Sequence, residues 1–188
     1  MNFNEHINEV NKKVIGTLAY ISRISNYFDK STRTMVVQSL VLSVINFCIR
    51  IWGSTSECQK IRVQKLQNFA ARVAVGGLRK FDHVSPAFEE LQWLRINEKH
   101  LYETLVHVFK NVNHIYPSWY SCYSYVQLVT NCNTRQENKL YVPKFKTDAG
   151  ARAMKVLGAK AWNNLPKHIT DATSLSSFKS QLKKHFLK

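Results

Sequence analysis

Histidine side chains are the first candidates for chemistry in this sequence, because three of them recur at a fixed interval. His100, His107 and His114 are seven residues apart, so on a helix they share a face but lie roughly 10 Å apart along its axis. Bonds from ligands to a zinc ion are about 2 Å long, so one ion cannot join all three. We expect surface or partly packed histidines and no metal site.

The cysteines offer no better site for metal binding or nucleophilic catalysis. Cys48, Cys58, Cys122 and Cys132 form no Cys-x-x-Cys pair, and the chain is too large and apolar to depend on disulfides. A zinc knuckle at the last two would lack a third ligand nearby, and the chain has no Gly-x-Ser-x-Gly elbow. We expect reduced thiols.

Acidic side chains do not form the cluster that two-metal phosphoryl transfer requires. Asp29, Asp82, Asp148 and Asp171 are isolated in sequence, and adjacent Glu residues occur only at 89 and 90. We therefore expect neither an enzyme nor a cofactor in the isolated chain. The same reasoning leaves no small-molecule substrate to propose.

Basic residues give the clearest indication of a partner. The chain has 188 residues, 45% of them apolar, and a formal net charge of +15, from 27 Lys and Arg against 12 Asp and Glu. Such an excess is typical of proteins that bind polyanions. Residues 139–188 hold 11 of these basic residues against two aspartates. We expect nucleic acid as the partner, bound through phosphates.

The candidate contacts fall in two groups. The first lies in the N-terminal body and comprises Lys12, Lys13, Lys60, Arg62, Lys65, Arg72, Arg79 and Lys80. The second lies in the C-terminal segment and comprises Lys144, Lys146, Arg152, Lys155 and Lys160. Trp162 lies close by and could stack on a base, although packing in the core is the favoured interpretation.

Helical periodicity predicts the elements that must position these side chains. Apolar residues at three- and four-residue steps predict a helix over 3–28. A second helix, over 32–51, is apolar nearly all round and should be covered on several sides. Its stretch 36–52 carries polar residues and is shorter than the roughly 20 apolar residues that a membrane span needs, so we expect a core helix and no membrane partner.

A third helix is predicted to begin at a capping box and to end at two glycines. Ser54 and Glu57 have the spacing of the capping box, and Gly76-Gly77 supplies a left-handed stop near residue 75. The residues expected to face inward are Ile61, Leu66, Phe69, Ala70 and Val73.

The remaining pattern completes an all-α prediction. Short helices are expected after Ser85-Pro86 and over 98–112, and residues 116–147 lose periodicity and resemble an irregular connector. We expect a helical bundle body over 1–115, the connector over 116–147, and a small basic helical C-terminal segment over 148–188. The N-terminus lacks a signal-peptide pattern, so an intracellular location, nuclear or cytoplasmic, is expected rather than secretion.

Short landmarks in a fixed order carry a resemblance that spans nearly the whole chain. They are Ser31-Thr32-Arg33 through Leu40-Val41 to Trp52-Gly53, Leu66 to Arg72, His83 with Ser85-Pro86, Leu91-x-x-Leu94-x-Ile96, Thr134-Arg135, Trp162-Asn163-x-Leu165-Pro166, and Phe178-Lys179 with Leu182-Lys183. In this order the chain resembles the segment downstream of the palm in reverse transcriptases of non-LTR, LINE-type retrotransposons, particularly jockey-like elements.

The resemblance implies that residues 3–77 correspond to the polymerase thumb, which grips a template–primer duplex, and that the remainder corresponds to the C-terminal extension. The palm of that family carries a Tyr/Phe-x-Asp-Asp metal site, and this sequence lacks one. The resemblance therefore implies a fragment of an RNA-directed DNA polymerase that binds RNA–DNA hybrid or duplex without reading sequence, with the missing palm and fingers as further partners. An inert or oligomerising helical relic without a nucleic-acid role is the alternative.

Overall fold

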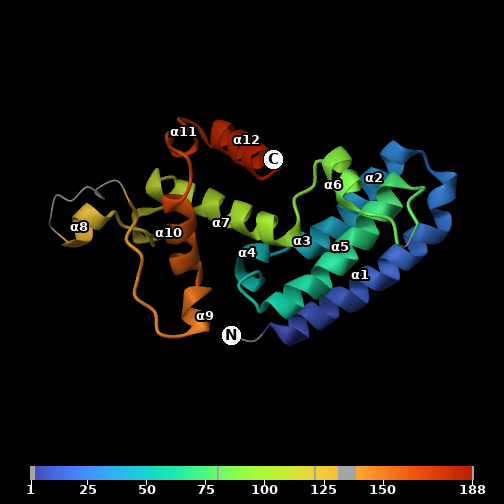
Figure 1. Cartoon of the computed structure of the whole chain (residues 1–188), viewed down its shortest axis with the longest axis horizontal. Coiled ribbons are helices and arrows are strands. Elements are labelled where there is room, and N and C mark those ends of the chain that lie inside the picture. The colour runs from blue at the N-terminus through green and yellow to red at the C-terminus, as the bar shows by residue number, and fades with distance from the viewer. Residues whose placement is uncertain (1–2, 80, 121, 131–138, 188) are drawn as a thin grey trace. The chain divides into compact units, whose positions relative to one another are not determined.

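Helices are the regular elements throughout the part of the chain that the computed structural model describes, residues 3–79, 81–120, 122–130 and 139–187 (Figure 1). Within those ranges strand-like pairing is limited to one antiparallel bridge, between Tyr125 and Leu140. The all-α prediction is confirmed. None of the described helices combines the length and apolar character that crossing a membrane requires.

The chain divides into two compact units, Met1–Lys99 and His100–Phe186. The division lies inside helix α7 (Ile96–Val112), before the end of the body expected at residue 115. The reason is packing: Ile96 belongs to the core of unit 1, and Leu105 and Phe109 belong to the core of unit 2. Each unit therefore has its own core.

Unit 1 consists of two long helices and several short ones. Its elements are α1 (Asn4–Ile24), the 3₁₀ turn η1 (Ser25–Tyr27), α2 (Lys30–Val37), the π-helical η2 (Gln38–Leu42), α3 (Ser43–Asn46), α4 (Ile49–Trp52), α5 (Glu57–Val75) and α6 (Ser85–Leu91). The predicted stripe of α1 is buried at Ile7, Val10, Val14, Leu18 and Ile21. This stripe packs against α5 and the α2–α3 region.

The predicted continuous helix over 32–51 is wrong. A π-helical segment interrupts it at Gln38–Leu42, and Cys48 adopts a left-handed conformation, with φ 51°, that separates α3 from α4. Covering on several sides is also wrong, because Leu40 and Phe47 are 53% and 67% exposed. The widened π turn rotates the side chains after it, so the apolar residues no longer share one enclosed environment.

Helix α5 begins later than the predicted capping box. Ser56 occupies the N-cap position, the Ser54 hydroxyl donates to the Ile51 carbonyl, and the Glu57 carboxylate pairs with Lys60. The predicted inward direction of Ile61 and Phe69 is also wrong, because these side chains are 54% and 37% exposed. The glycine stop is confirmed: Gly76 and Gly77 both have φ of 75°.

Unit 2 has short helices around an aromatic core. Besides most of α7 it contains η3 (Ser118–Tyr120), α8 (Val126–Thr130), α9 (Asp148–Ala151), α10 (Met154–Asn163), α11 (Lys167–Thr170) and α12 (Leu175–Phe186). Phe109 of α7 stacks on Phe178 of α12, with ring centroids 4.3 Å apart, and Trp162 of α10 packs beside both. The core interpretation of Trp162 is confirmed.

The described part of residues 116–147 contributes to this core, although its sequence has little periodicity. Tyr123 and Leu140 are 6% and 1% exposed. The buried Asn111 amide accepts from the backbone N–H groups of Cys122 and Tyr123, at 3.3 Å each, and the Asn163 amide exchanges two 2.9 Å hydrogen bonds with Leu140. Two asparagines on helices thus hold non-helical backbone in place.

Candidate nucleic-acid interface

The exposed face of α5 gathers three of the predicted cations. A helix turns by about 100° per residue, so Arg62, Lys65 and Arg72 lie within a quarter-turn of one another and opposite the buried face at Val63, Ala70 and Ala74. None of the three pairs with a described carboxylate. This face therefore presents uncompensated positive charge on a rigid 19-residue helix.

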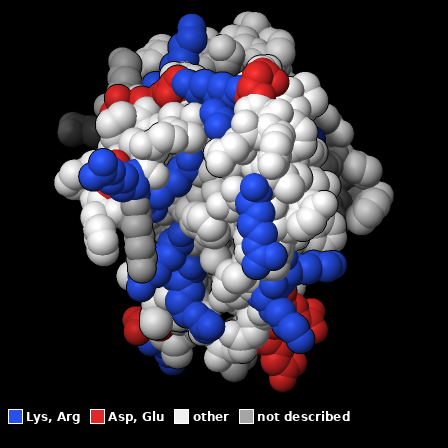
Figure 2. Space-filling model, turned by 90° about the vertical axis from the view of Figure 1, so that its right-hand side faces the viewer, with Lys and Arg blue, Asp and Glu red and all other residues white. Residues whose placement is uncertain are grey.

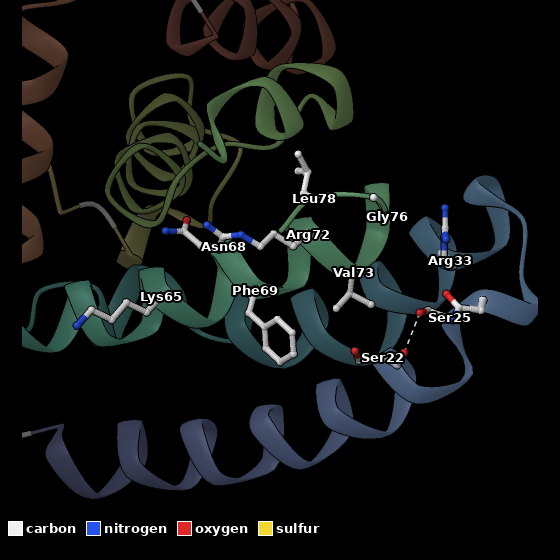
Figure 3. Close-up of a pocket in the computed structure, with 12 residues that line it drawn as sticks. Ser22, Ser25, Arg33, Lys65, Asn68, Phe69, Arg72, Val73, Gly76 and Leu78 are labelled. Atoms are coloured by element: carbon white, nitrogen blue, oxygen red, sulfur yellow. Dashed lines mark hydrogen bonds between the residues drawn. The ribbon is translucent and has the colours of Figure 1, made fainter. Parts of the chain in front are cut away.

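A cavity of about 770 Å³ lies beside this face, bounded by the end of α1, by α2, and by α5 with the chain that follows it. Figure 3 shows Lys65, Asn68, Phe69 and Arg72 spaced along α5, with Phe69 directed toward α1. The walls also include Arg33 of α2, and none of the described carboxylates lines the cavity. A concave site with three cations and a partly exposed ring suits an anion that carries an apolar group.

Arg33 is fixed in this wall by the C-terminus of α5. Its Nη2 donates to the Val75 carbonyl at 3.0 Å, where the negative end of the helix dipole favours a cation. The guanidinium lies so near Gly76 that a Cβ there would be 2.7 Å from Nη1. The positive φ and this close approach both require glycine at position 76.

Arg72 and Arg79 organise the loop after α5. The Arg72 guanidinium donates to the carbonyls of Arg79 and Asp82, at 3.3 and 3.0 Å, and the Asp82 carboxylate accepts from the Arg79 N–H at 2.7 Å. Arg72 thus has a structural role as well as a place in the cavity wall. Arg79 is exposed outside it.

Lys60 does not join this face. Its ammonium pairs with the Glu57 carboxylate at 2.8 Å, and the side chain lines a separate cavity of about 300 Å³ with Arg95 and Glu98. The neighbouring carboxylates offset its charge. Arg62, in contrast, donates to the Gln59 amide at 3.1 Å, and because this partner is uncharged it does not offset the positive charge of Arg62.

The candidates on α1 also lie elsewhere. Lys12 and Lys13 are exposed, and Lys13 lines a third cavity, of about 310 Å³, with Glu9 and Phe47. Neither lysine borders the cavity beside α5. Lys80 lies outside the described residues.

The candidates of unit 2 form a separate basic region. Lys144, Lys146 and Lys155 are exposed and Arg152 is half-buried. The Lys160 ammonium lies 4.3 Å from the centroid of the Phe145 ring, a cation–π contact. Since Trp162 is buried, base stacking by that ring is not available in this region.

Of the residues that line the cavity, only Lys65 and Arg72 were candidates from the sequence, and the residues missed include Arg33, Asn68 and Phe69. The last two could have been found, because positions 65, 68, 69 and 72 have the three- and four-residue spacing of one helix face. Arg33 could not, because 42 residues separate it from the carbonyl that it contacts.

The distribution of charge on the surface supports anion binding. In Figure 2, Lys and Arg extend across the middle of one face, whereas Asp and Glu lie toward its margins. Among the described residues no three His, Cys, Asp or Glu side chains come together as metal ligands. His100 and His107 are 2% and 1% exposed, more deeply packed than expected from the sequence.

Comparison of the chain with models of protein families, with curated proteins and with solved structures finds no match.

Proposed function

We propose that this protein binds duplex nucleic acid or RNA–DNA hybrid through its phosphates, with the exposed face of α5 as the main contact. The observation that carries the proposal is the set Arg62, Lys65 and Arg72, which no described carboxylate neutralises. Seven residues of α-helix separate Lys65 from Arg72, about 10 Å along the axis. Long side chains at that separation can reach the phosphates of one strand.

The mode of binding is independent of sequence. Cations held on a helix can neutralise phosphates whatever the bases are, and phosphate contacts position a protein without carrying sequence information. The uncharged side chains near this face line a cavity, so they do not project into a groove of the duplex where bases could be contacted. We therefore assign recognition to backbone charge and shape.

We also propose that the chain is the thumb and downstream extension of a non-LTR retrotransposon reverse transcriptase, without catalytic activity of its own. The order of the sequence landmarks and the all-helical unit 1 support this origin. The isolated aspartates support the lack of activity. Sequencing the gene immediately upstream tests the origin: an in-frame Asp-Asp palm supports it, and an unrelated reading frame contradicts it.

Salt dependence tests the binding. A fluorescent 20-base-pair RNA–DNA hybrid is titrated with the full chain at 50 and 200 mM KCl, and affinity is expected to fall steeply because bound cations release counterions. Absence of binding at 50 mM, or affinity that is insensitive to salt, would reject the proposal.

Matched charge variants locate the contact. Lys65→Gln is expected to weaken binding to every sequence and to reduce the slope of log K against log salt by about one. Lys12→Gln removes an exposed lysine of α1 away from the cavity and should leave the slope nearly unchanged. Equal losses in the two variants would mean that net charge alone, rather than the α5 face, governs binding.

Self-association is the second candidate function, and exposed apolar side chains favour it. Met35, Leu40, Phe47 and Ile51, between α2 and α4, are each at least half exposed. Exposed apolar groups of this kind promote contacts between proteins. Light scattering over a hundredfold range of concentration distinguishes the two: a monodisperse monomer contradicts self-association, and oligomers without nucleic-acid binding support it.

A further inference from the structure

The cavity beside α5 has the size of a site for a small ligand. Its volume of about 770 Å³ is typical of sites for small molecules, which span roughly 300–1,000 Å³. A protein–DNA interface, by contrast, covers about 1,000–2,500 Å² of protein surface. A double helix that rests on Arg62 and Lys65 would therefore leave the interior of the cavity empty.

The interior combines apolar and polar surface in a way that phosphate alone does not require. Phe69, Val73 and Leu78 supply apolar surface, and Phe69 remains 37% exposed beside the end of α1 (Figure 3). Asn26 and Asn68 add amide groups to the wall. An aromatic ring with nearby amides is the chemistry that receives an unpaired base, by stacking and by hydrogen bonds to its edge.

The charges around this interior select an anion. Lys65, Arg72 and Arg33 line the cavity with no carboxylate among the lining residues. Arg33 and Arg72 are held by backbone carbonyls, so their positions are set before a ligand arrives. The ammonium of Lys65, on an exposed and flexible stem, can close on a phosphate from solvent.

We propose that the cavity binds one unpaired nucleotide at the end of a duplex, with its base against Phe69 and its phosphate between Lys65 and Arg72. This inference rests on the proposed nucleic-acid binding and adds a second component to it. The α5 face holds the paired region through phosphates, and the cavity holds the first nucleotide beyond it. The chain then distinguishes strand ends with overhangs from blunt ends.

Two probes separate this component from duplex binding. The full chain is titrated with a blunt 20-base-pair hybrid and with the same hybrid carrying a two-nucleotide overhang at its 3′ or 5′ end. Stacking of one base contributes about 1–3 kcal/mol, so the overhang of the preferred polarity is expected to raise affinity about 5- to 150-fold. No binding of the blunt hybrid contradicts the proposed function, and equal affinity for blunt and overhanging hybrids contradicts the cavity.

A pair of matched substitutions locates the effect. Phe69→Leu keeps an apolar side chain on α5 but removes the ring, so it should abolish the gain from the overhang and leave blunt-end affinity unchanged. Phe47→Leu makes the same change at an exposed phenylalanine of unit 1 outside the cavity and should retain the gain. Persistence of the gain in Phe69→Leu, with helicity unchanged by circular dichroism, would overturn the inference.

A free nucleoside monophosphate distinguishes strand ends from soluble nucleotides. The strand-end assignment predicts that millimolar monophosphate leaves most of the overhang preference intact, because a tethered nucleotide has a high effective concentration at the cavity. Complete loss of the preference at micromolar monophosphate would reassign the cavity to free nucleotides and overturn the inference.

Discussion

Unit 1 and unit 2 are both helical, but their cores are built differently. Unit 1 packs aliphatic stripes of long helices, such as Ile7, Val14 and Leu18 of α1, against α5. Unit 2 stacks Phe109, Trp162 and Phe178, and it relies on side chains of Asn111 and Asn163 to hold irregular backbone. Periodic sequence thus gives a rigid scaffold for exposed cations, whereas a core with little periodicity depends on a few large rings.

The largest expected effect is on the aromatic core. Phe178→Ala removes a fully buried ring that stacks on Phe109, so it should destabilise unit 2 by about 3–5 kcal/mol. Because the cores are separate, unit 1 should keep its stability. Hydrogen exchange resolved by segment measures both: α10 and α12 should lose protection while α1 and α5 retain it. Equal loss in all four helices would contradict the division into two units.

Alanine substitutions at two glycines, one in each unit, are expected to change the free energy of unfolding in opposite directions. A Cβ at Gly158 would lie 3.0 Å from Val108 and from the Tyr123 ring, and closer still to the Tyr123 hydroxyl. Gly158→Ala should therefore overpack the core and destabilise unit 2 by about 1–3 kcal/mol, which exceeds the gain in helix propensity. Gly16 of α1 has nothing within 4 Å, so Gly16→Ala should stabilise unit 1 by about 0.5–1 kcal/mol. Denaturant unfolding measures both, and a stabilising Gly158→Ala would show that unit 2 is loosely packed.

The smallest expected effect concerns the cap of α2 and depends on pH. The Thr32 hydroxyl and the backbone N–H groups of Thr32 and Ser31 donate to the Asp29 carboxylate and hold its pKa below the ordinary value of 3.8. This stabilisation is complete above pH 3.8 and is lost as the pH falls through the lowered folded pKa.

Asp29→Asn keeps an acceptor but removes the charge, so it serves as the matched variant. Its thermal midpoint should lie below that of the natural chain at pH 7, and the two should converge near pH 2. A gap of the same size at both pH values would show that the charge of Asp29 has no role in the cap.

The difference between local spacing and contacts over long distances in sequence explains which features could be predicted. The α1 stripe and the Gly76-Gly77 stop follow from local spacing, and both are confirmed. The break at Cys48 could not be predicted, because a cysteine rarely adopts a left-handed conformation and its immediate neighbours, Phe47 and Ile49, are apolar.

The candidate site shows the same limit. Lys65 and Arg72 could be named from charge alone, but the cavity between them depends on Arg33 reaching the Val75 carbonyl and on Phe69 remaining partly exposed. The aromatic residue was predicted to face inward because hydrophobic residues at helical spacing usually do. Contacts between residues far apart in sequence, and the exposure that they leave, require the assembled unit.

Side-chain amides of α5 connect the cavity wall to the backbone of Ile96, which does not line the cavity. The side-chain nitrogen of Gln64 donates to the side-chain oxygen of Asn68 at 2.8 Å, and the side-chain oxygen of Gln64 accepts from the Ile96 N–H at 2.9 Å. A ligand that binds the side-chain oxygen of Asn68 competes with Gln64 for it, and a shift of Gln64 alters the partner of the Ile96 N–H. The chemical shift of the Ile96 backbone proton, measured by nuclear magnetic resonance, should therefore change when the cavity is occupied, and it requires no label on the ligand.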